Sequence, residues 1–331
     1  MSAIRGRPFT FALLLSTFAL ALVAADASAQ SAVSYPSRPV RVIVPYSPGG
    51  SSDTTARIVG EKLREILGQP FVIDNRPGAS GSLGRELVAK ASPDGYTLLL
   101  GDSPHTINVH VLKHVPYDPI KDFTPITLLA TAPQTLVVHP GFAAKTLKDF
   151  VATARAQPGK LNYGSGGSGA ITHLTGELFK LATGVNIVHV PYKSIALASA
   201  DVISGQIQCA FPTAPGVVAH AQAGRLRMLG ITTVKRSVTL PEVPTFEESG
   251  IQGMVVSNWF GTFAPAQLPK EILAKLHKAI LDAMQSPDVR TKFGNLSLDI
   301  TTLTPRAFDA HLRSELEKWG KVVKAAGIKA E

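Results

Sequence analysis

Two short segments rich in glycine and serine carry the residue types best suited to holding an anion. The first covers residues 47–53 and includes Gly49 and Gly50, and the second covers residues 164–169. Glycine has no Cβ atom, so a ligand can approach its backbone closely. Each segment precedes an expected helix, whose first N–H groups lack intrahelical partners and carry about half a positive charge. We therefore predict that both loops bind a carboxylate through backbone N–H groups.

Side chains add to this chemistry. Ser51 and Ser52 supply hydroxyl donors in the first loop, and Asp53 is of the residue type that caps a helix N-terminus. Ser165 and Ser168 repeat the pattern in the second loop. Taken alone, either loop also fits an ordinary capped turn, but two such loops in one chain favour a binding function.

The second loop also matches the dinucleotide fingerprint G-x-G-x-x-G at Gly164, Gly166 and Gly169. A dinucleotide site needs an acidic residue about 20 residues later, on the ribose hydroxyl. Residues 186–190 read Asn-Ile-Val-His-Val instead. We expect no cofactor.

A serine-type hydrolase is the main alternative from another functional class. Residues 166–170 read Gly-Gly-Ser-Gly-Ala, which departs from the nucleophile elbow G-x-S-x-G only at its last position. Ser52 or Ser168, together with His173 and Asp53, would supply the residue types of a catalytic triad. His173 follows the loop on the same expected helix, however, and a free serine there serves equally well as a hydrogen-bond donor. We predict no catalytic residue.

The histidines give no metal site. Among them only His105, His110 and His114 cluster in the sequence. His110 and His114 could lie one helical turn apart, but no carboxylate or cysteine completes a ligand set.

Strands and helices alternate along the chain, which predicts an α/β fold with parallel strands and crossover helices. Before the midpoint we expect strands at 39–46, 71–74 and 96–101, with helices after the first two. A second block has expected helices at 147–156 and 170–183 and strands at 161–163, 185–190, 207–211 and 226–232. Because each block opens a helix from a glycine-rich loop, we predict two lobes that face a ligand cleft.

The lobes are expected to be connected twice. The extended segments 127–139 and 259–265 have the character of interlobe connections, and the helices at 270–284 and 305–326 then return to the first lobe. We place lobe 1 at residues 35–133 with 258–331 and lobe 2 at residues 134–257.

Composition limits the possible partners. After removal of a leader about 300 residues remain, which is more than one hydrophobic core usually holds. The net charge is +9, but the 33 lysines and arginines are scattered. No run of like charges appears, so we expect no nucleic-acid partner. The diffuse positive field can speed encounter with anionic solutes.

The first residues predict export. Arg5 and Arg7 precede an apolar run at residues 9–25, and Ala27-Ser28-Ala29 offers a cleavage site, so residues 1–29 are assigned as a signal peptide. A cut after Ala25-Asp26-Ala27 is the alternative. The run is shorter than the roughly 20 residues that a spanning helix needs. The only cysteine, Cys209, allows no internal disulfide and no lipid anchor near the cleavage site. We expect a periplasmic monomer.

Short motifs are distributed over the whole chain that follows. They are Tyr46-Ser47-Pro48-Gly49-Gly50-Ser51-Ser52-Asp53 with Ala56-Arg57, Asp74-Asn75-Arg76-Pro77-Gly78-Ala79, Pro93-Asp94-Gly95-Tyr96-Thr97-Leu98, Pro116-Tyr117-Asp118-Pro119, His173-Leu174-Thr175-Gly176-Glu177-Leu178-Phe179, Val190-Pro191-Tyr192-Lys193 and Trp319-Gly320-Lys321-Val322-Val323. As a set they closely resemble the Bug-type receptors of tripartite tricarboxylate transport systems. The resemblance implies a two-lobed type 2 periplasmic-binding-protein fold that closes over a small organic acid. It also implies a membrane permease of two other subunits, although many such receptors lack one nearby.

The resemblance places the carboxylate between the two glycine-rich loops, held by backbone amides, hydroxyls and waters. The predicted ligand-binding residues are Tyr46, Ser47, Gly49, Gly50, Ser51, Ser52, Asp53, Ser103, His105, Gly166, Gly167, Ser168, Gly169, Ile171, Thr172, Ser194, Pro212 and Thr213.

The chain departs from the family pattern toward apolar residues. Ile195 and Leu197 lie in a stretch where relatives usually have Gly-Ser-Ala-Pro, Ile171 stands where many have serine or threonine, and Pro212 replaces a frequent acidic residue. Such residues offer no partner to additional charges on a ligand. We therefore expect a small carboxylate with an apolar or aromatic body, preferred over citrate or aspartate. A receptor that only signals to a membrane kinase remains an alternative to a transport receptor.

Overall fold

The computed structural model describes residues 35–237 and 240–330. The chain divides into a unit of residues Met1–Ser37 and a unit of residues Arg38–Glu331. Only residues 35–37 of the first unit are described, and the predicted signal peptide lies outside the described residues. The second unit carries all the secondary structure discussed below. Among the described helices none is long and apolar enough to cross a membrane.

The first sheet has six strands in the order β11-β4-β10-β3-β1-β2. Their bounds are β1 (Val40–Val44), β2 (Phe71–Asn75), β3 (Thr97–Asp102), β4 (Phe123–Pro133), β10 (Ser257–Pro265) and β11 (Asp299–Ile300). The strands β1, β2 and β3 are parallel, whereas β10 runs antiparallel between β3 and β4. The expectation of a parallel sheet therefore holds for one side of the sheet only.

Seven helical segments connect or flank the strands of the first sheet. They are α2 (Ser51–Leu67), η1 (Ala79–Gly81), α3 (Ser82–Ala89), α4 (Pro104–Val111), α9 (Lys270–Gln285), α10 (Pro287–Asn295) and α11 (Pro305–Ala325). Helix α2 ends as the sequence predicts, because Gly68 takes the left-handed conformation (φ 72°) and its N–H bonds to the carbonyl of Arg64. The core between these elements is apolar and aromatic, and includes Ile43, Leu99, Phe123, Trp259, Phe263 and Phe308.

The second sheet has five strands in the order β7-β6-β8-β5-β9. The bounds are β5 (Thr135–Val138), β6 (Asn162–Ser165), β7 (Val188–Pro191), β8 (Cys209–Ala210) and β9 (Arg227–Ile231), with α5 (Leu147–Ala156), α6 (Ile171–Thr183), α7 (Ile195–Ile203), η2 (Ala214–Gly216) and α8 (Val218–Gln222) around them. The strands β6, β7 and β8 are parallel, and β5 is antiparallel to β8 and β9. Cys209 is buried in the core of this sheet.

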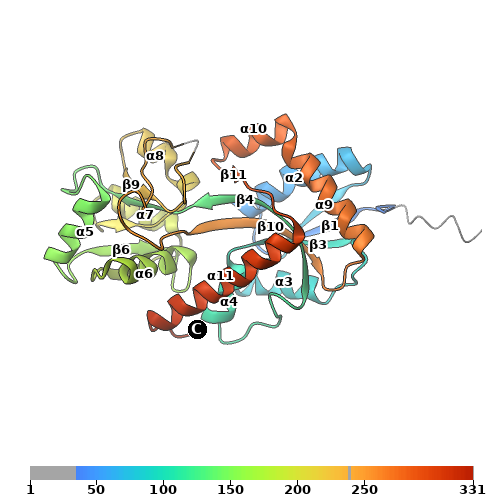
Figure 1. Ribbon diagram of the computed structural model, residues 1–331, viewed down its shortest axis with the longest axis horizontal. Coiled ribbons are helices and arrows are strands. Elements are labelled where there is room, and N and C mark those ends of the chain that lie inside the picture. The colour runs from blue at the N-terminus through green and yellow to red at the C-terminus, as the bar shows by residue number, and fades with distance from the viewer. Residues whose placement is uncertain (1–34, 238–239, 331) are drawn as a thin grey trace, which may run out of the picture. The chain divides into compact units, whose positions relative to one another are not determined.

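Strands β4 and β10 pair along their length and lead from one sheet to the other (Figure 1). Only Gln134 separates β4 in the first sheet from β5 in the second. The chain returns to the first sheet where β10 begins at Ser257. The first sheet thus includes Ser257, which the prediction placed in lobe 2, and the lobe boundaries stay a prediction.

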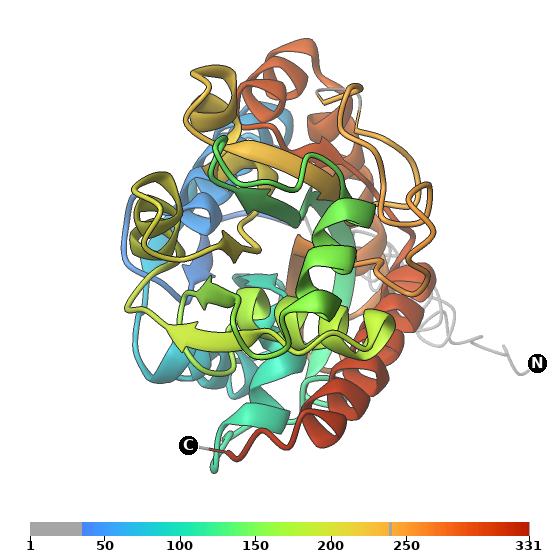
Figure 2. The same ribbon diagram turned by 90° about the vertical axis from the view of Figure 1, so that its left-hand side faces the viewer.

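An apolar cluster also joins the two halves. Its buried members come from α4, α6, α11 and the segment before β10, and they are Ile107, Val111, Leu174, Val256, Trp319, Val322 and Val323. Helix α11 lies alongside α4 in both views and contacts α6 as well (Figures 1 and 2). The C-terminal helix thus packs on elements of both predicted lobes rather than on the first alone.

Candidate functional site

The strand order brings the ends of neighbouring parallel strands together. In the first sheet β1 lies beside β3, so the loop after Val44 is close to Asp102 at the end of β3. In the second sheet β6 lies beside β8, with Gly164 next to Ala210. The second glycine-rich loop therefore emerges next to Pro212 and Thr213. Ligand sites of α/β proteins form at such carboxyl edges of parallel strands.

The first loop presents open backbone. Gly49 has a φ of +89°, which favours glycine, and a Cβ atom placed on either Gly49 or Gly50 would have no heavy atom within 4 Å. Gly50 is the N-cap of α2 and is extended (φ −81°, ψ 172°). The N–H groups of Ser51 and Ser52 belong to the first helical turn, where no intrahelical acceptor exists for them. Ser47 and Ser51 are exposed. This loop can hold an anion on its N–H groups.

Asp53 does not cap the helix as expected, because it lies in the first turn rather than at the N-cap. Its carboxylate accepts from the N–H of Gly49 (2.9 Å), from Asn75 Nδ2 (3.0 Å) and from Arg57 Nε (3.0 Å). The hydrogen bond from Arg57 is the main cause that lowers the pKa of Asp53 to about 2. Asn75 also donates to the carbonyl of Tyr46 (3.0 Å). Asp53 and Asn75 therefore shape the loop, and the charge of Asp53 is balanced by Arg57.

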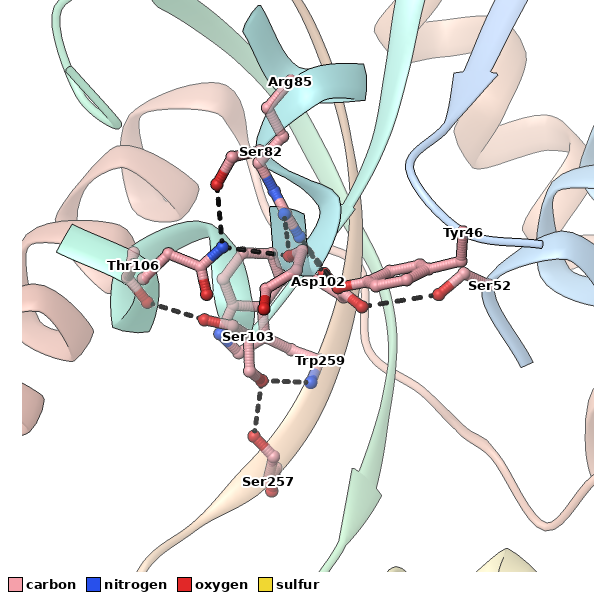
Figure 3. A network of polar contacts seen from close by, with 11 residues as sticks. Tyr46, Ser52, Ser82, Arg85, Asp102, Ser103, Thr106, Ser257 and Trp259 are labelled. Atoms are coloured by element: carbon pink, nitrogen blue, oxygen red, sulfur yellow. Dashed lines mark hydrogen bonds and ion pairs between the residues drawn. The ribbon is translucent and has the colours of Figure 1, made fainter. Parts of the chain in front are cut away.

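A buried ion pair lies beneath the loop (Figure 3). The side chain of Arg85 on α3 is fully buried and its Nη2 is 2.5 Å from Asp102 Oδ1. Tyr46 donates its hydroxyl to the same carboxylate (3.0 Å) and accepts from Arg85 (3.0 Å), while Ser52 Oγ donates to the other oxygen of Asp102 at 3.4 Å. Two predicted ligand residues, Tyr46 and Ser52, are thus connected through one carboxylate.

These contacts decide what Tyr46 can offer a ligand. Burial raises the pKa of the Tyr46 hydroxyl, so it stays neutral. Burial also raises the pKa of Asp102 above its ordinary value. The charge of Arg85 and the hydrogen bonds that Asp102 accepts oppose this rise. The hydroxyl of Tyr46 is engaged on both sides, and its half-buried ring is the part left to contact a ligand.

Sequence reasoning missed Arg85 and Asp102. Arg85 shares a helix with the fully buried Val88, so a charged residue on an apolar helix face was the available signal. Asp102 ends a strand that was predicted, at the edge where the first loop was expected to lie.

The structure places Ser103 and His105 inside the protein. Ser103 Oγ donates to the carbonyl of Ser257 (3.2 Å) and accepts from the N–H of Trp259 (3.0 Å), which ties β3 to β10. His105 is fully buried against the rings of Phe123 and Phe263, and its Nε2 bonds to the carbonyl of Pro119 (2.8 Å). Burial lowers the pKa of His105 to about 3. Their expected role as direct ligand contacts is not supported, because both side chains are engaged within the fold.

The second loop differs from the first in that its N–H groups are largely engaged. The N–H of Gly166 bonds to Thr172 Oγ1 (2.9 Å), that of Gly167 to Ser165 Oγ (3.1 Å) and that of Gly169 to His173 Nδ1 (3.0 Å). Gly169 also lies close to Val111 of α4, because a Cβ atom added to Gly169 would be 3.0 Å from the Cβ atom of Val111. The expectation that both loops repeat the same chemistry is therefore wrong for the loop itself.

Open groups remain next to this loop. Ser168 is exposed, and Ile171 and Thr172 begin α6, so their N–H groups belong to its first turn. The hydroxyl of Thr172 accepts from Gly166 and is buried. Gly167 (φ +119°) and Gly169 (φ +73°) need glycine, whereas Gly166 does not take a positive φ.

The remaining predicted residues lie in different surroundings. Ile171 packs against the apolar cluster that joins α4, α6 and α11. Ser194 is the N-cap of α7 and accepts from the N–H of Leu197 (3.4 Å). Pro212 is buried, and its carbonyl accepts from the N–H of Thr135 (2.8 Å). Thr213 is half-buried at the end of this segment.

The triad considered for a hydrolase is not assembled. Asp53 bonds to Arg57, Asn75 and Gly49, and His173 Nδ1 accepts from Gly169. A different serine and histidine do meet, since Ser165 Oγ lies 2.6 Å from His189 Nε2. Ser165 is fully buried, however, and its oxygen is also bonded within its own loop.

The histidine environments favour packing over catalysis or metal binding. Burial, and then the neighbouring His173, lower the pKa of His189 to about 4, and the two rings stack 3.8 Å apart. His110 Nε2 bonds to the carbonyl of Leu316 (2.9 Å). Within residues 35–237 and 240–330, no group of three potential ligands could hold a metal ion.

Comparison with known proteins gives one consistent result. Residues 55–328 match the family model described as the tripartite tricarboxylate transporter family receptor. The chain is 35% identical over 301 residues to Protein BugT of Bordetella pertussis, which covers 90% of this chain and 92% of BugT. It is 34% identical to an R. palustris protein solved with adipate (TM-score 0.78; 90% and 100% covered) and 32% identical to Rhodopseudomonas palustris MatC with bound malate (TM-score 0.73; 87% and 100%). The predicted α/β, two-lobed type 2 periplasmic-binding-protein fold is confirmed by these likenesses.

Proposed function

The chain belongs to the tripartite tricarboxylate transporter receptor family, and we propose that it captures a small organic carboxylate in the periplasm for a transporter of that type. Proteins of this family bind solutes and are not enzymes, so the chain is a solute-binding receptor rather than a hydrolase. A permease of two membrane subunits is its proposed partner, and we propose that the receptor itself is a monomer.

The observation that carries this proposal is the open first turn of α2. A Cβ atom added to Gly49 or Gly50 would meet no heavy atom within 4 Å, so the backbone just before Ser51 is open to approach by a ligand. The N–H groups there carry a partial positive charge, and the nearby carboxylate of Asp53 is paired with Arg57. A carboxylate is the ligand group that this arrangement suits best.

The opposite side of the site is proposed to come from the start of α6. Ser168 supplies an exposed hydroxyl, and Ile171 and Thr172 supply first-turn N–H groups. Two helix N-termini then share one carboxylate, and closure of the lobes brings the second helix to the ligand. Of the predicted residues, Ser103 and His105 are proposed to support the site from within.

The body of the ligand is proposed to be apolar or aromatic, but on narrower grounds than the sequence offered. Ile171 and Ile195 pack against core clusters, and Leu197 is 51% exposed. Arg57 and Arg85, the basic residues next to the first loop, are both paired with carboxylates. The exposed Lys193 follows β7, whose last residue pairs with Ser165 at the second loop, so this lysine is the basic residue available to a second charged group of the ligand. Because relatives have been solved with adipate and with malate, a dicarboxylate is the alternative ligand.

Two measurements test the proposal. Native mass spectrometry of protein purified without refolding would reveal a retained acid of small mass. Thermal-shift screening of benzoate-like, branched aliphatic, dicarboxylic and tricarboxylic acids then ranks ligands, because a ligand at 100 times its Kd adds about 2.7 kcal/mol of stability. We expect stoichiometric binding of a carboxylate that is recovered unchanged. Turnover of the bound acid, or no stabilisation by any carboxylate, would refute the receptor proposal.

A further inference from the structure

The side-chain amide of Gln134 is buried without a hydrogen-bond partner among the described residues. It is fully buried, and neither Oε1 nor Nε2 has a hydrogen-bond partner in the part of the chain that the structure describes. An amide has two N–H donors and a carbonyl acceptor, and burying all of them unpaired costs free energy. Such a buried amide is expected to have a partner from outside the chain, which is an ordered water or a ligand.

The backbone of Gln134 is held firmly in place. Its N–H donates to Thr232 Oγ1 (2.9 Å), and its carbonyl accepts from the N–H of Thr232 (3.0 Å). The chain passes from the first sheet to the second at this residue. The backbone from which the amide extends is therefore fixed by the strands and does not depend on a surface loop.

Pairing places Gln134 between the two halves of the candidate site. On the side of the first sheet, Ser103 at the end of β3 donates to the carbonyl of Ser257, and Ser257 pairs with Pro133. On the side of the second sheet, Gln134 forms an antiparallel bridge with Thr213. A continuous series of neighbours thus leads from the edge that carries the first loop, through Gln134, to the edge that carries the second.

The bridge also gives the direction of the side chain. Residues paired across an antiparallel bridge present their side chains on the same face. The side chains of Gln134 and of the half-buried Thr213 therefore start from neighbouring positions on the same face, where β8 ends.

We propose that Gln134 and Thr213 form a second recognition point, which binds a neutral hydrogen-bonding group of the ligand at a distance from its carboxylate. The inference rests on the proposed function of the site. None of the neighbours of Gln134 in this series, Ser103, Ser257, Pro133, Thr213 and Thr232, carries a charge. An amide that both donates and accepts, beside a hydroxyl that does the same, matches a ligand hydroxyl or carboxamide. A second ionised carboxylate only accepts hydrogen bonds, so it would provide no donor for Oε1.

The test compares matched ligand pairs that differ by one hydroxyl. Suitable pairs are benzoate with its 3- and 4-hydroxy forms, and butyrate, valerate and hexanoate with their terminal hydroxy acids. Isothermal titration of the wild-type protein should give about 5- to 10-fold tighter binding of the hydroxylated member of at least one pair. Gln134→Met, which keeps length and removes both polar atoms, should bind the two members of that pair within about 2-fold.

A second variant and a control complete the design. Thr213→Val should reduce the same preference without depending on the fold tolerating a change at Gln134. Thr55→Val removes another buried hydroxyl, on α2, that has no partner within residues 35–237 and 240–330, and it should keep the wild-type preference.

The outcomes separate this inference from the proposed function. If the wild-type protein binds carboxylates but prefers the hydroxylated member of no pair, or if both variants keep the preference, the second recognition point is refuted. If no carboxylate binds at all, the proposed function itself fails.

Discussion

Removal of the charge of Asp102 is the most informative single change. The Asp102→Asn variant keeps the shape of the side chain but leaves the fully buried guanidinium of Arg85 without its counter-charge. Breaking a buried ion pair by removing one partner typically costs 3–5 kcal/mol. Because asparagine keeps one carbonyl acceptor for Arg85 or Tyr46, we expect the lower end, about 3 kcal/mol.

The assay is equilibrium unfolding by urea together with a thermal scan. For a chain of this length about 2 °C is lost for each kcal/mol, so the melting temperature should fall by about 6 °C. Ligand affinity should also fall, because Asp102 holds both Tyr46 and Ser52. Tyr46→Phe is the matched control, since it removes one hydroxyl and leaves the ion pair, and it should cost about 1 kcal/mol.

A double-mutant cycle isolates the pair. Arg85→Met combined with Asp102→Asn removes both charges, so the double variant should be more stable than the sum of the two single effects predicts, by at least 1 kcal/mol. A loss below about 1 kcal/mol in Asp102→Asn, or additive effects in the cycle, would show that the buried pair does not support the loop.

Three further changes test other parts of the site. Gly50→Val should leave the melting temperature close to that of the wild type, because the φ of Gly50 is −81° and its surroundings are open. The branched side chain should nevertheless block the approach of a ligand and abolish binding. A folded variant with wild-type affinity would show that the first loop is not part of the site. Asp53→Asn should lower the free energy of unfolding by about 2 kcal/mol at neutral pH, because the pKa of Asp53 in the folded protein is about 2, below the ordinary 3.8. The ionised carboxylate therefore stabilises the fold fully above pH 4, and this contribution is lost as the pH falls through 2. A loss of stability in this variant that is as large at pH 2 as at pH 7 would refute the charge argument. Solution scattering should show compaction on ligand binding, with bending at 130–135 and 259–265, and an unchanged radius of gyration at saturation would count against closure.

Local patterns identified most elements, because they depend on neighbours in the sequence. The helix expected at 147–156 is α5, and α2 ends at Gly68 as its residue type predicts. The direction of β10 could not be found in this way, since the pairing of a strand depends on residues more than a hundred positions away. Helix α4 has the weak periodicity of a short, largely buried helix, and it was not predicted.

The same distinction between local and distant determinants applies to the residues of the candidate site. The open backbone of Gly49 and Gly50 follows from residue type and spacing, and the structure has it where the sequence placed it. Whether a serine hydroxyl is free depends on its distant partners, and those of Ser103 are in β10. The role of Arg85 likewise depends on Asp102, which lies 17 positions later. Sequence spacing identifies groups capable of binding, but only the fold determines which of them are already engaged.

The two loops that look alike in the sequence therefore offer unequal numbers of free N–H groups to a ligand. In the first loop Asp53 takes up only the N–H of Gly49, so the first turn of α2 stays open to a ligand. In the second loop three glycine N–H groups are engaged by Ser165, Thr172 and His173, and Gly169 packs against α4. The loop with more free donors gains more from an anion, so we infer that the carboxylate binds to the first loop before the second helix closes on it. The order also suits selectivity, because the second half of the site then contacts a ligand whose carboxylate is already fixed.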